Sequence, residues 1–414
     1  MDSPDDASQP ATDDGREPAE QKRPTDQPST TAVKTAAEAT DRKSSPGSDS
    51  TSPAAAAGRV PDGTKAKGEG RPAATATPVI RLTPELRELG QRIRRCLAFY
   101  YYRPESASER SPWGVMHYAI GFGVDAQLNV GDDNVNALAW LCGNRSCNGL
   151  RMFTTDRRGG LDVRLGPGYQ GHEGQFLSVL ALTRVQPDYP LTVADQKLTI
   201  ADLVQREQRT CRVGTELTFK LIGLSHYLDS DAQWVASDDQ RWDIPRLIRE
   251  EIAQPVIGSA CGGTHRLIGL AYAVNRRERV QRPVTGQWLR AKQYVASYQQ
   301  YTFKLQNRDG SFSTKWFEGR AHSGDLNRYL NTTGHALEWL TFSLPKDQLT
   351  DPRLVRMVSF LENLMWENRT FRWDIGPKGH ALRALGLYDE YVFGGQPGQR
   401  AVQLAEALRD KRLR

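Results

Sequence analysis

Five of the seven histidines stand at or near the start of apolar runs that recur along the chain. His117 leads into Tyr-Ala-Ile-Gly-Phe, His265 leads into Arg-Leu-Ile-Gly-Leu, and Glu216 precedes a similar run. The remaining histidines with this placement are His172, His335 and His380. If each run is a helix, its dipole favours the neutral imidazole at the N-terminus. Neutral imidazole is the form that binds a metal or accepts a proton.

If these helices run parallel around an axis, the side chains converge at one end of it. We therefore expect the catalytic residues among this set: His172, Glu216, His265, His335 and His380. Ser311 to Arg328 is long and polar, and a loop of this kind is often functional. With His117, we expect aromatic side chains to bind substrate: Trp316, Phe317 and Trp373.

Three interpretations of the histidines remain open. In the first, they bind zinc or a similar divalent ion that activates water, with ligands drawn from His172, Cys261, His265, His335 and His380. In the second, they line a metal-free pocket for a polar substrate such as a glycan, with one histidine as general base. In the third, they are structural and tie helix starts to neighbouring loops.

The elements that would position these residues are helices of two kinds. Runs that are apolar on all sides predict buried helices at 113–122, 172–183, 215–228, 264–275, 334–344 and 379–388. Amphipathic patterns predict covering helices at 84–102, 199–209, 245–254, 287–304 and 352–365. This alternation predicts an all-α fold, an α/α toroid of about six helical hairpins. In 134–153, a Gly-Asn-Arg-Ser turn favours a small β-hairpin insert over a helix.

One segment, Gln306–Phe312, resembles the Gln-x-x-Asp-Gly-Ser-Phe/Trp repeat of the terpenoid cyclase and protein prenyltransferase superfamily, and Glu367–Trp373 is a weaker copy. The resemblance implies an α/α toroid in which this repeat lies between an outer and an inner helix. It implies no catalytic residue, because the Asp-x-Asp-Asp acid of the cyclases is absent. Cys261 with His265 approaches the zinc ligands of the prenyltransferases but lacks their Asp, and Asp238–Asp243 is expected to be a surface loop.

Composition divides the chain into three parts. Residues 1–78 contain no aromatic residue and predict a disordered tail; 79–395 form the toroid domain, and 396–414 a short basic helix or tail. The tail carries 10 basic and 13 acidic residues, so the net charge of +6 leaves about +9 on the remainder. These charges are dispersed, so we expect no nucleic-acid partner. The five irregularly spaced cysteines predict free thiols rather than a disulfide framework.

No apolar run of membrane-spanning length is present, and the N-terminus lacks the pattern of a signal peptide. We therefore expect a cytoplasmic protein, or an exported one if translation starts upstream. The sequence does not define the oligomeric state. The function expected is a lyase or hydrolase on a polar, saccharide-like substrate. The alternatives are a non-catalytic binding or scaffold module, and a divergent cyclase or prenyltransferase.

Overall fold

The computed structural model describes residues 80–409, which belong to one compact unit, Pro78–Arg414. The expected disordered tail lies outside the described residues. The described part is mostly helical and contains a few small sheets. Its α-helices are α1 (Pro84–Tyr101), α2 (Pro112–Phe122), α3 (Ala137–Cys142), α4 (Gln175–Leu182), α5 (Ile200–Arg209), α6 (Thr218–Tyr227), α7 (Ile244–Ile252), α8 (Thr264–Arg279), α9 (Gly286–Leu305), α10 (Leu326–Ser343), α11 (Pro352–Glu367), α12 (Ile375–Phe393) and α13 (Arg400–Arg409).

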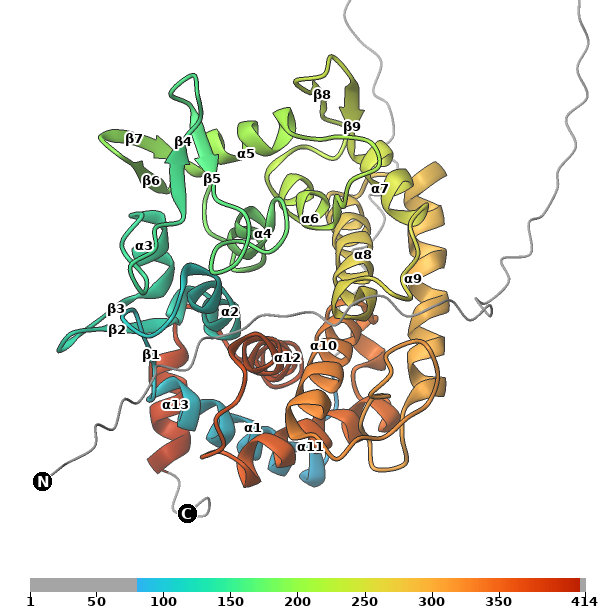
Figure 1. Ribbon diagram of the computed structural model, residues 1–414. Coiled ribbons are helices and arrows are strands. Elements are labelled where there is room, and N and C mark those ends of the chain that lie inside the picture. Colours follow the sequence, from blue (N-terminus) through green and yellow to red (C-terminus); the bar gives the residue numbers. More distant parts are fainter. Residues whose placement is uncertain (1–79, 410–414) are drawn as a thin grey trace, which may run out of the picture. The chain divides into compact units, whose positions relative to one another are not determined.

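Six of these helices contact one another in cyclic order. Helix α2 packs on α4, α4 on α6, α6 on α8, α8 on α10, α10 on α12, and α12 again on α2 (Figure 1). They are the six helices expected to be buried, and their sequences are apolar on nearly all sides. We call them the inner helices. No such helix could form its buried surface alone, because each depends on its two neighbours to exclude water from both flanks.

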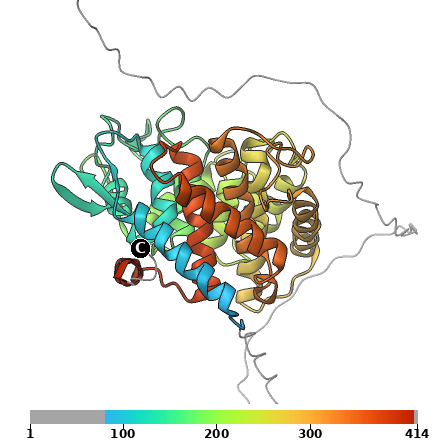
Figure 2. The same cartoon turned by 90° about the horizontal axis from the view of Figure 1, so that it is seen from below.

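The other helices cover the inner ones, and we call them the outer helices. Helices α3, α5, α7, α9 and α11 each pack on one or two inner helices (Figure 1). Helix α1 lies beside α11 and α12, and α13 packs on α1 (Figure 2). Amphipathic sequences suit these positions. In α7, for example, Leu247 and Ile248 are fully buried while Arg249 on the next position carries its charge outside the core.

Short hairpins connect several inner helices to the outer helix that follows. These hairpins pair β2 with β3, β6 with β7 and β8 with β9. A further hairpin, β4 with β5, lies between α3 and the inner helix α4. The strands are β1 (Glu105–Ser106), β2 (Gln127–Val130), β3 (Asp133–Asn136), β4 (Phe153–Thr155), β5 (Leu161–Val163), β6 (Pro190–Val193), β7 (Gln196–Thr199), β8 (Gln233–Val235) and β9 (Arg241–Asp243). The last residue of β3, β7 and β9 is also the N-cap of α3, α5 and α7: Asn136, Thr199 and Asp243.

The segment 134–153 does not form the expected hairpin. Ala137–Cys142 is helix α3, and Asn136 starts it by accepting a hydrogen bond from the backbone N–H of Ala139 at 3.0 Å. The Gly-Asn-Arg-Ser turn leads only to an isolated bridge between Cys147 and Leu150. The Asn136 cap favours a helix here, because it satisfies one of the backbone donors that the first helical turn leaves without a partner. The Asp238–Asp243 segment is the turn and second strand of the β8–β9 hairpin.

The Gln306–Phe312 segment lies between outer helix α9 and inner helix α10, the place that the resemblance implies. The Gln306 side-chain amide donates hydrogen bonds to the carbonyls of Gly310 and Arg353, at 3.0 and 2.9 Å. It thereby ties the loop to α11, while Phe312 is fully buried in the core. The motif thus has a structural role. Among the described residues, no helix combines the length and apolar character needed to cross a membrane.

Candidate functional site: a histidine cavity and a cysteine–histidine cluster

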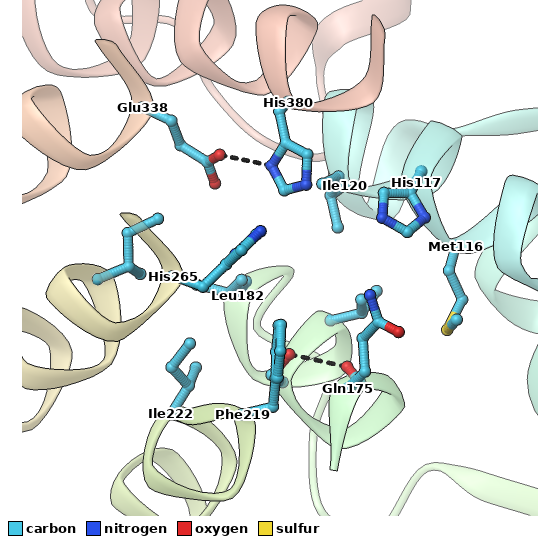
Figure 3. A pocket seen from close by; sticks show the side chains of 13 residues that line it. Met116, His117, Ile120, Gln175, Leu182, Phe219, Ile222, His265, Glu338 and His380 are labelled. Carbon is cyan, nitrogen blue, oxygen red and sulfur yellow. Dashed lines mark hydrogen bonds and ion pairs between the residues drawn. The ribbon is translucent and has the colours of Figure 1, made fainter. Parts of the chain in front are cut away.

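All six inner helices contribute to one small cavity (Figure 3). It has about 20 Å³ of space for water-sized molecules, which is room for one or two waters or a single ion. The lining is apolar apart from a few side chains that point inward. These are His117, Gln175, Ser178, His265, Glu338 and His380. We call this the histidine cavity.

Close packing of α12 on α2 brings the histidines together. A Cβ on Gly379 would lie 1.9 Å from the backbone oxygen of His117, so only glycine permits this approach. The His117 and His380 ring centroids are 5.5 Å apart as a result. His335 lies 3.9 Å from His380 and 5.1 Å from His265, and His265 lies 4.9 Å from His380. Four imidazoles from four helices therefore form one contact group.

Each of three histidines in this group has its Nδ1 held by an acceptor. His117 Nδ1 bonds the Trp113 carbonyl and His335 Nδ1 bonds the Asn331 carbonyl, both at 2.8 Å. A carbonyl can only accept, so in these two rings Nδ1 carries the proton and Nε2 is a lone-pair acceptor. His380 Nδ1 bonds a carboxylate oxygen of Glu338 at 2.7 Å (Figure 3). The same arrangement of a fixed Nδ1–H and a free Nε2 is found in metal-binding histidines.

Burial keeps these imidazoles neutral. It lowers the pKa of His117 and of His380 to about 3, with positive charge on neighbouring groups adding to the effect. Burial and the neighbouring histidines hold the pKa values of His265 and His335 well below the ordinary range. Burial raises the pKa of Glu338 although Arg383 opposes the shift. The cavity therefore presents basic nitrogen lone pairs in a poorly hydrated space.

The helix dipole is not the cause of this neutrality, contrary to expectation. Of the four buried histidines, only His265 stands in a first turn, because α8 starts at Thr264. Helices α2, α10 and α12 start well before their histidines, at Pro112, Leu326 and Ile375. The dipole effect falls off within one turn, so desolvation is the physical reason that remains.

A cluster suited to a metal ion lies beside the cavity. Cys261, His265 and His335 each offer one ligand atom, and these three atoms lie within 4.8 Å of one another. It is the one group of this kind that the described residues contain. The His335 Nε2 atom is fully buried and has no hydrogen-bond partner, which is costly unless something binds it. A thiolate and two imidazoles are ligands that zinc prefers.

The loop that carries Cys261 has an unusual backbone. Cys261, Gly262 and Gly263 have φ angles of 50°, 62° and 76°, so three consecutive residues are left-handed. For cysteine this conformation is strained, and strain of this kind concentrates at functional sites. Trp316 covers the loop, and its ring lies 5.6 Å from that of His335, edge to face. A Cβ on Gly262 would lie 2.3 Å from the Trp316 ring.

A second carboxylate–histidine pair lies at the margin of the cavity. His172 Nδ1 bonds Glu216 at 2.6 Å, and both side chains are partly exposed. The His172 ring lies 4.8 Å from Phe219, whose ring lies 5.2 Å from that of His265. The structure thus places this pair next to the buried histidines across one phenyl ring. It does not bring His172 or His380 into the cysteine–histidine cluster.

The aromatic residues expected to bind substrate do not lie together in the structure. Trp316 contacts the cluster, but Phe317 is 1% exposed and packs among Tyr298, Tyr301 and Phe312. Trp373 is buried and donates a hydrogen bond to the hydroxyl of Tyr100 on α1, away from the cavity lining.

Sequence reasoning missed Gln175, Glu338 and Arg383. Glu338 follows His335 by three residues, and Arg383 follows His380 by three, so each pair lies on one helix face. Glu338 is 2% exposed, and its Oε1 lies 2.8 Å from Arg383 Nε. A charged residue inside an apolar run, three positions after a histidine, was the signal that could have identified both.

Comparison of the chain with known protein families, with curated proteins and with solved structures gives no match. Only the site itself therefore indicates a function.

Proposed function

We propose that the described domain is an α/α toroid that uses a divalent metal ion, zinc by its ligand chemistry, to hydrolyse or eliminate on a polar, saccharide-like substrate. The observation that carries the proposal is the cluster of Cys261, His265 and His335, with ligand atoms within 4.8 Å and a buried His335 Nε2 that has no partner. The divalent ion supplies Lewis acidity and lowers the pKa of a bound water toward neutrality.

The toroid part of the proposal is supported by three observations. The inner helices contact one another in a closed cycle. Helices α5, α7, α9 and α11 each pack on two inner helices that are adjacent in that cycle. The Gln306–Phe312 loop lies between an outer and an inner helix, as in the superfamily it resembles.

The chain's own residues have distinct roles in this proposal. Three protein ligands leave one tetrahedral position open, which is typical of a catalytic zinc site rather than a structural one. Asn331 orients His335 through its carbonyl, and Glu338 orients His380. The partly exposed His172, held by Glu216, is the side chain best placed to take a proton from water or substrate arriving from solvent.

A second candidate function is favoured by the size of the histidine cavity. Its space of about 20 Å³ cannot hold a sugar ring. His117 in its lining and the neighbouring His335 each bond a backbone carbonyl of their own helix. A domain that binds a metal ion and presents it to a partner, without catalysis, agrees with both observations. Substrate would otherwise have to approach the cluster from the side of Cys261 and His172.

Metal analysis of the purified chain tests the proposal. We expect about one equivalent of zinc after loading and dialysis, and its loss in Cys261→Ser and His335→Ala. His322→Ala is the matched control, because His322 is exposed in the loop before α10 and lies outside the cluster. Cobalt loading should give a thiolate-to-cobalt charge-transfer band that Cys261→Ser lacks.

Two outcomes separate the interpretations. Stoichiometric metal with glycan or ester turnover that follows metal content supports the enzyme, whereas metal without turnover on a broad substrate panel supports the binding domain. If the parent protein bound no more metal than Cys261→Ser does, both the metal enzyme and the metal-binding domain would be refuted.

A further inference from the structure

A second cavity lies further along the same inner helices. It shares Ile120 and Leu182 with the histidine cavity and continues toward the C-terminal ends of α2 and α4. Its charged lining residues are Arg184, Arg383, Glu390 and Arg400. Helix α12 lines both cavities: His380 lies in the first, and Arg383, three residues further along the helix, lies in the second. We call the second cavity the arginine pocket.

Arg383 is a buried cation with unused donors. Its side chain is 8% exposed, and its Nε lies 2.8 Å from Glu338 Oε1. Within residues 80–409, Nε is fully buried and forms no hydrogen bond despite this close contact, and the guanidinium borders the pocket. A guanidinium has five N–H donors in a fixed planar fork. An acceptor in the pocket would engage donors that the described part of the chain leaves unused.

The other two arginines approach the same space with part of their donors engaged. Arg400 is 5% exposed; its Nη1 lies 2.9 Å from Asp389, and its Nη2 donates to the Gly386 carbonyl at 2.7 Å. Arg184 follows α4 and bonds Glu390 at 2.6 Å. Both therefore keep fixed positions at the rim and wall of the pocket.

The pocket lining itself carries more cations than carboxylates. Arg184, Arg383 and Arg400 line it, against Glu390 alone. Asp389 lies behind them and is shared, because it bonds both Arg94 and Arg400, at 2.8 and 2.9 Å. Asp125 also lies within electrostatic reach of Arg400. An anion inside the pocket would therefore face three arginines and one carboxylate.

We propose that the arginine pocket binds a single oxyanion group, a phosphate, sulfate or carboxylate, through Arg383 with Arg184 and Arg400. The pocket has about 40 Å³ for water-sized molecules. At about 10–15 Å³ for each water, this is room for about three waters, comparable to one phosphate group. Arginine forks bind such groups through paired, charge-assisted hydrogen bonds. The site is separate from the cysteine–histidine cluster and does not depend on a metal.

Calorimetric titration of the full chain with inorganic phosphate, sulfate and acetate tests this proposal. Zinc can also bind these anions, so the protein is treated with chelator and ionic strength is held constant with sodium chloride. We expect saturable binding of at least one of the three anions. The comparison of phosphate and sulfate with acetate shows whether the natural group is tetrahedral or a carboxylate.

The variants identify the site. Arg184→Gln should weaken binding at least tenfold, and Arg383→Lys, which keeps the charge but loses the planar fork, should weaken it several-fold. Arg290→Gln is the matched control, because it removes an exposed arginine charge on outer helix α9 and should bind like the parent. Cys261→Ser should also bind like the parent, which separates this site from the metal proposal.

Absence of saturable binding of all three anions would exclude an oxyanion site at this pocket. Equal weakening by Arg184→Gln and Arg290→Gln would show only general attraction to a basic surface. If Arg383→Lys fails to fold, as judged by circular dichroism, Arg184→Gln still decides, because Arg184 is half exposed and lies outside the core.

Discussion

Replacement of Gly262 by alanine should destabilise the cysteine loop through a specific collision. The new Cβ would lie 2.3 Å from the Trp316 ring, far inside contact distance, and the residue has a φ angle of +62°. The left-handed conformation costs about 1–2 kcal/mol for an L-residue. Overpacking adds about 1–3 kcal/mol. We therefore expect Gly262→Ala to lower the free energy of unfolding by about 2–5 kcal/mol.

Gly258 is the matched control for this substitution. It has a φ angle of +82°, but a Cβ there would meet no atom within 4 Å. Gly258→Ala should therefore show the backbone cost alone, about 1–2 kcal/mol. The difference between the two variants in urea-induced unfolding measures the collision with Trp316.

A double variant tests the cause. In Gly262→Ala/Trp316→Ala the ring is gone, so the two costs should fall short of additivity by about 1–3 kcal/mol. Zinc binding should weaken in Gly262→Ala, because the shifted loop carries Cys261. Our reasoning about the loop is refuted if Gly262→Ala is no more destabilising than Gly258→Ala, or if the double variant is additive.

Three further predictions concern other parts of the domain. Burial, with nearby arginines, lowers the pKa of His226 from 6.5 to about 4, so between these values the unfolded chain binds a proton that the folded protein excludes. His226 should therefore lower the free energy of unfolding by up to about 1.4 kcal/mol for each unit that the pH falls through this window, and His226→Asn should remove this part of the slope in urea unfolding. Cys261 is the one cysteine that is not buried, so iodoacetamide at pH 8 should modify it first, and bound zinc should protect it in peptide mass spectrometry. Glu251 is fully buried and accepts hydrogen bonds from Leu217 N–H and Arg266, so Glu251→Ala should cost about 3–5 kcal/mol in the same unfolding assay.

The inner and outer helices could be predicted because the spacing of apolar residues along each helix reflects how many of its faces are buried. The apolar run after His265 and the amphipathic pattern of α7 differ in a way that burial alone explains. Helix starts were harder. The sequence predicts a polar loop over Ser311 to Arg328 and a helix from residue 334, yet α10 already begins at Leu326. Thr332 and Thr333 are fully buried there, and Asp325 caps the helix. Tertiary contacts override the local pattern in this segment.

The sequence indicated part of the membership of the candidate site but not its geometry. Recurring histidines before apolar runs indicated which side chains would meet. Their grouping depends on contacts that no spacing reveals, such as the approach of α12 to His117 at Gly379. Cys261 reaches the cluster because three consecutive residues, Cys261 to Gly263, have a left-handed backbone. The two glycines suggest such a conformation in the sequence, but the cysteine before them does not.

The geometry of the cluster suits the metal ion that we propose. His335 must direct a lone pair inward, because its Nδ1 donates to a backbone carbonyl. One ring nitrogen of His265 and the sulfur of Cys261 lie within 4.8 Å of the His335 ligand atom and of each other, so the three groups converge. One water molecule has two protons and can donate to two imidazole lone pairs. A divalent cation can bind both imidazoles together with the sulfur. A structural role for the histidines requires no such convergence, since each could bond its own helix and face away from the others.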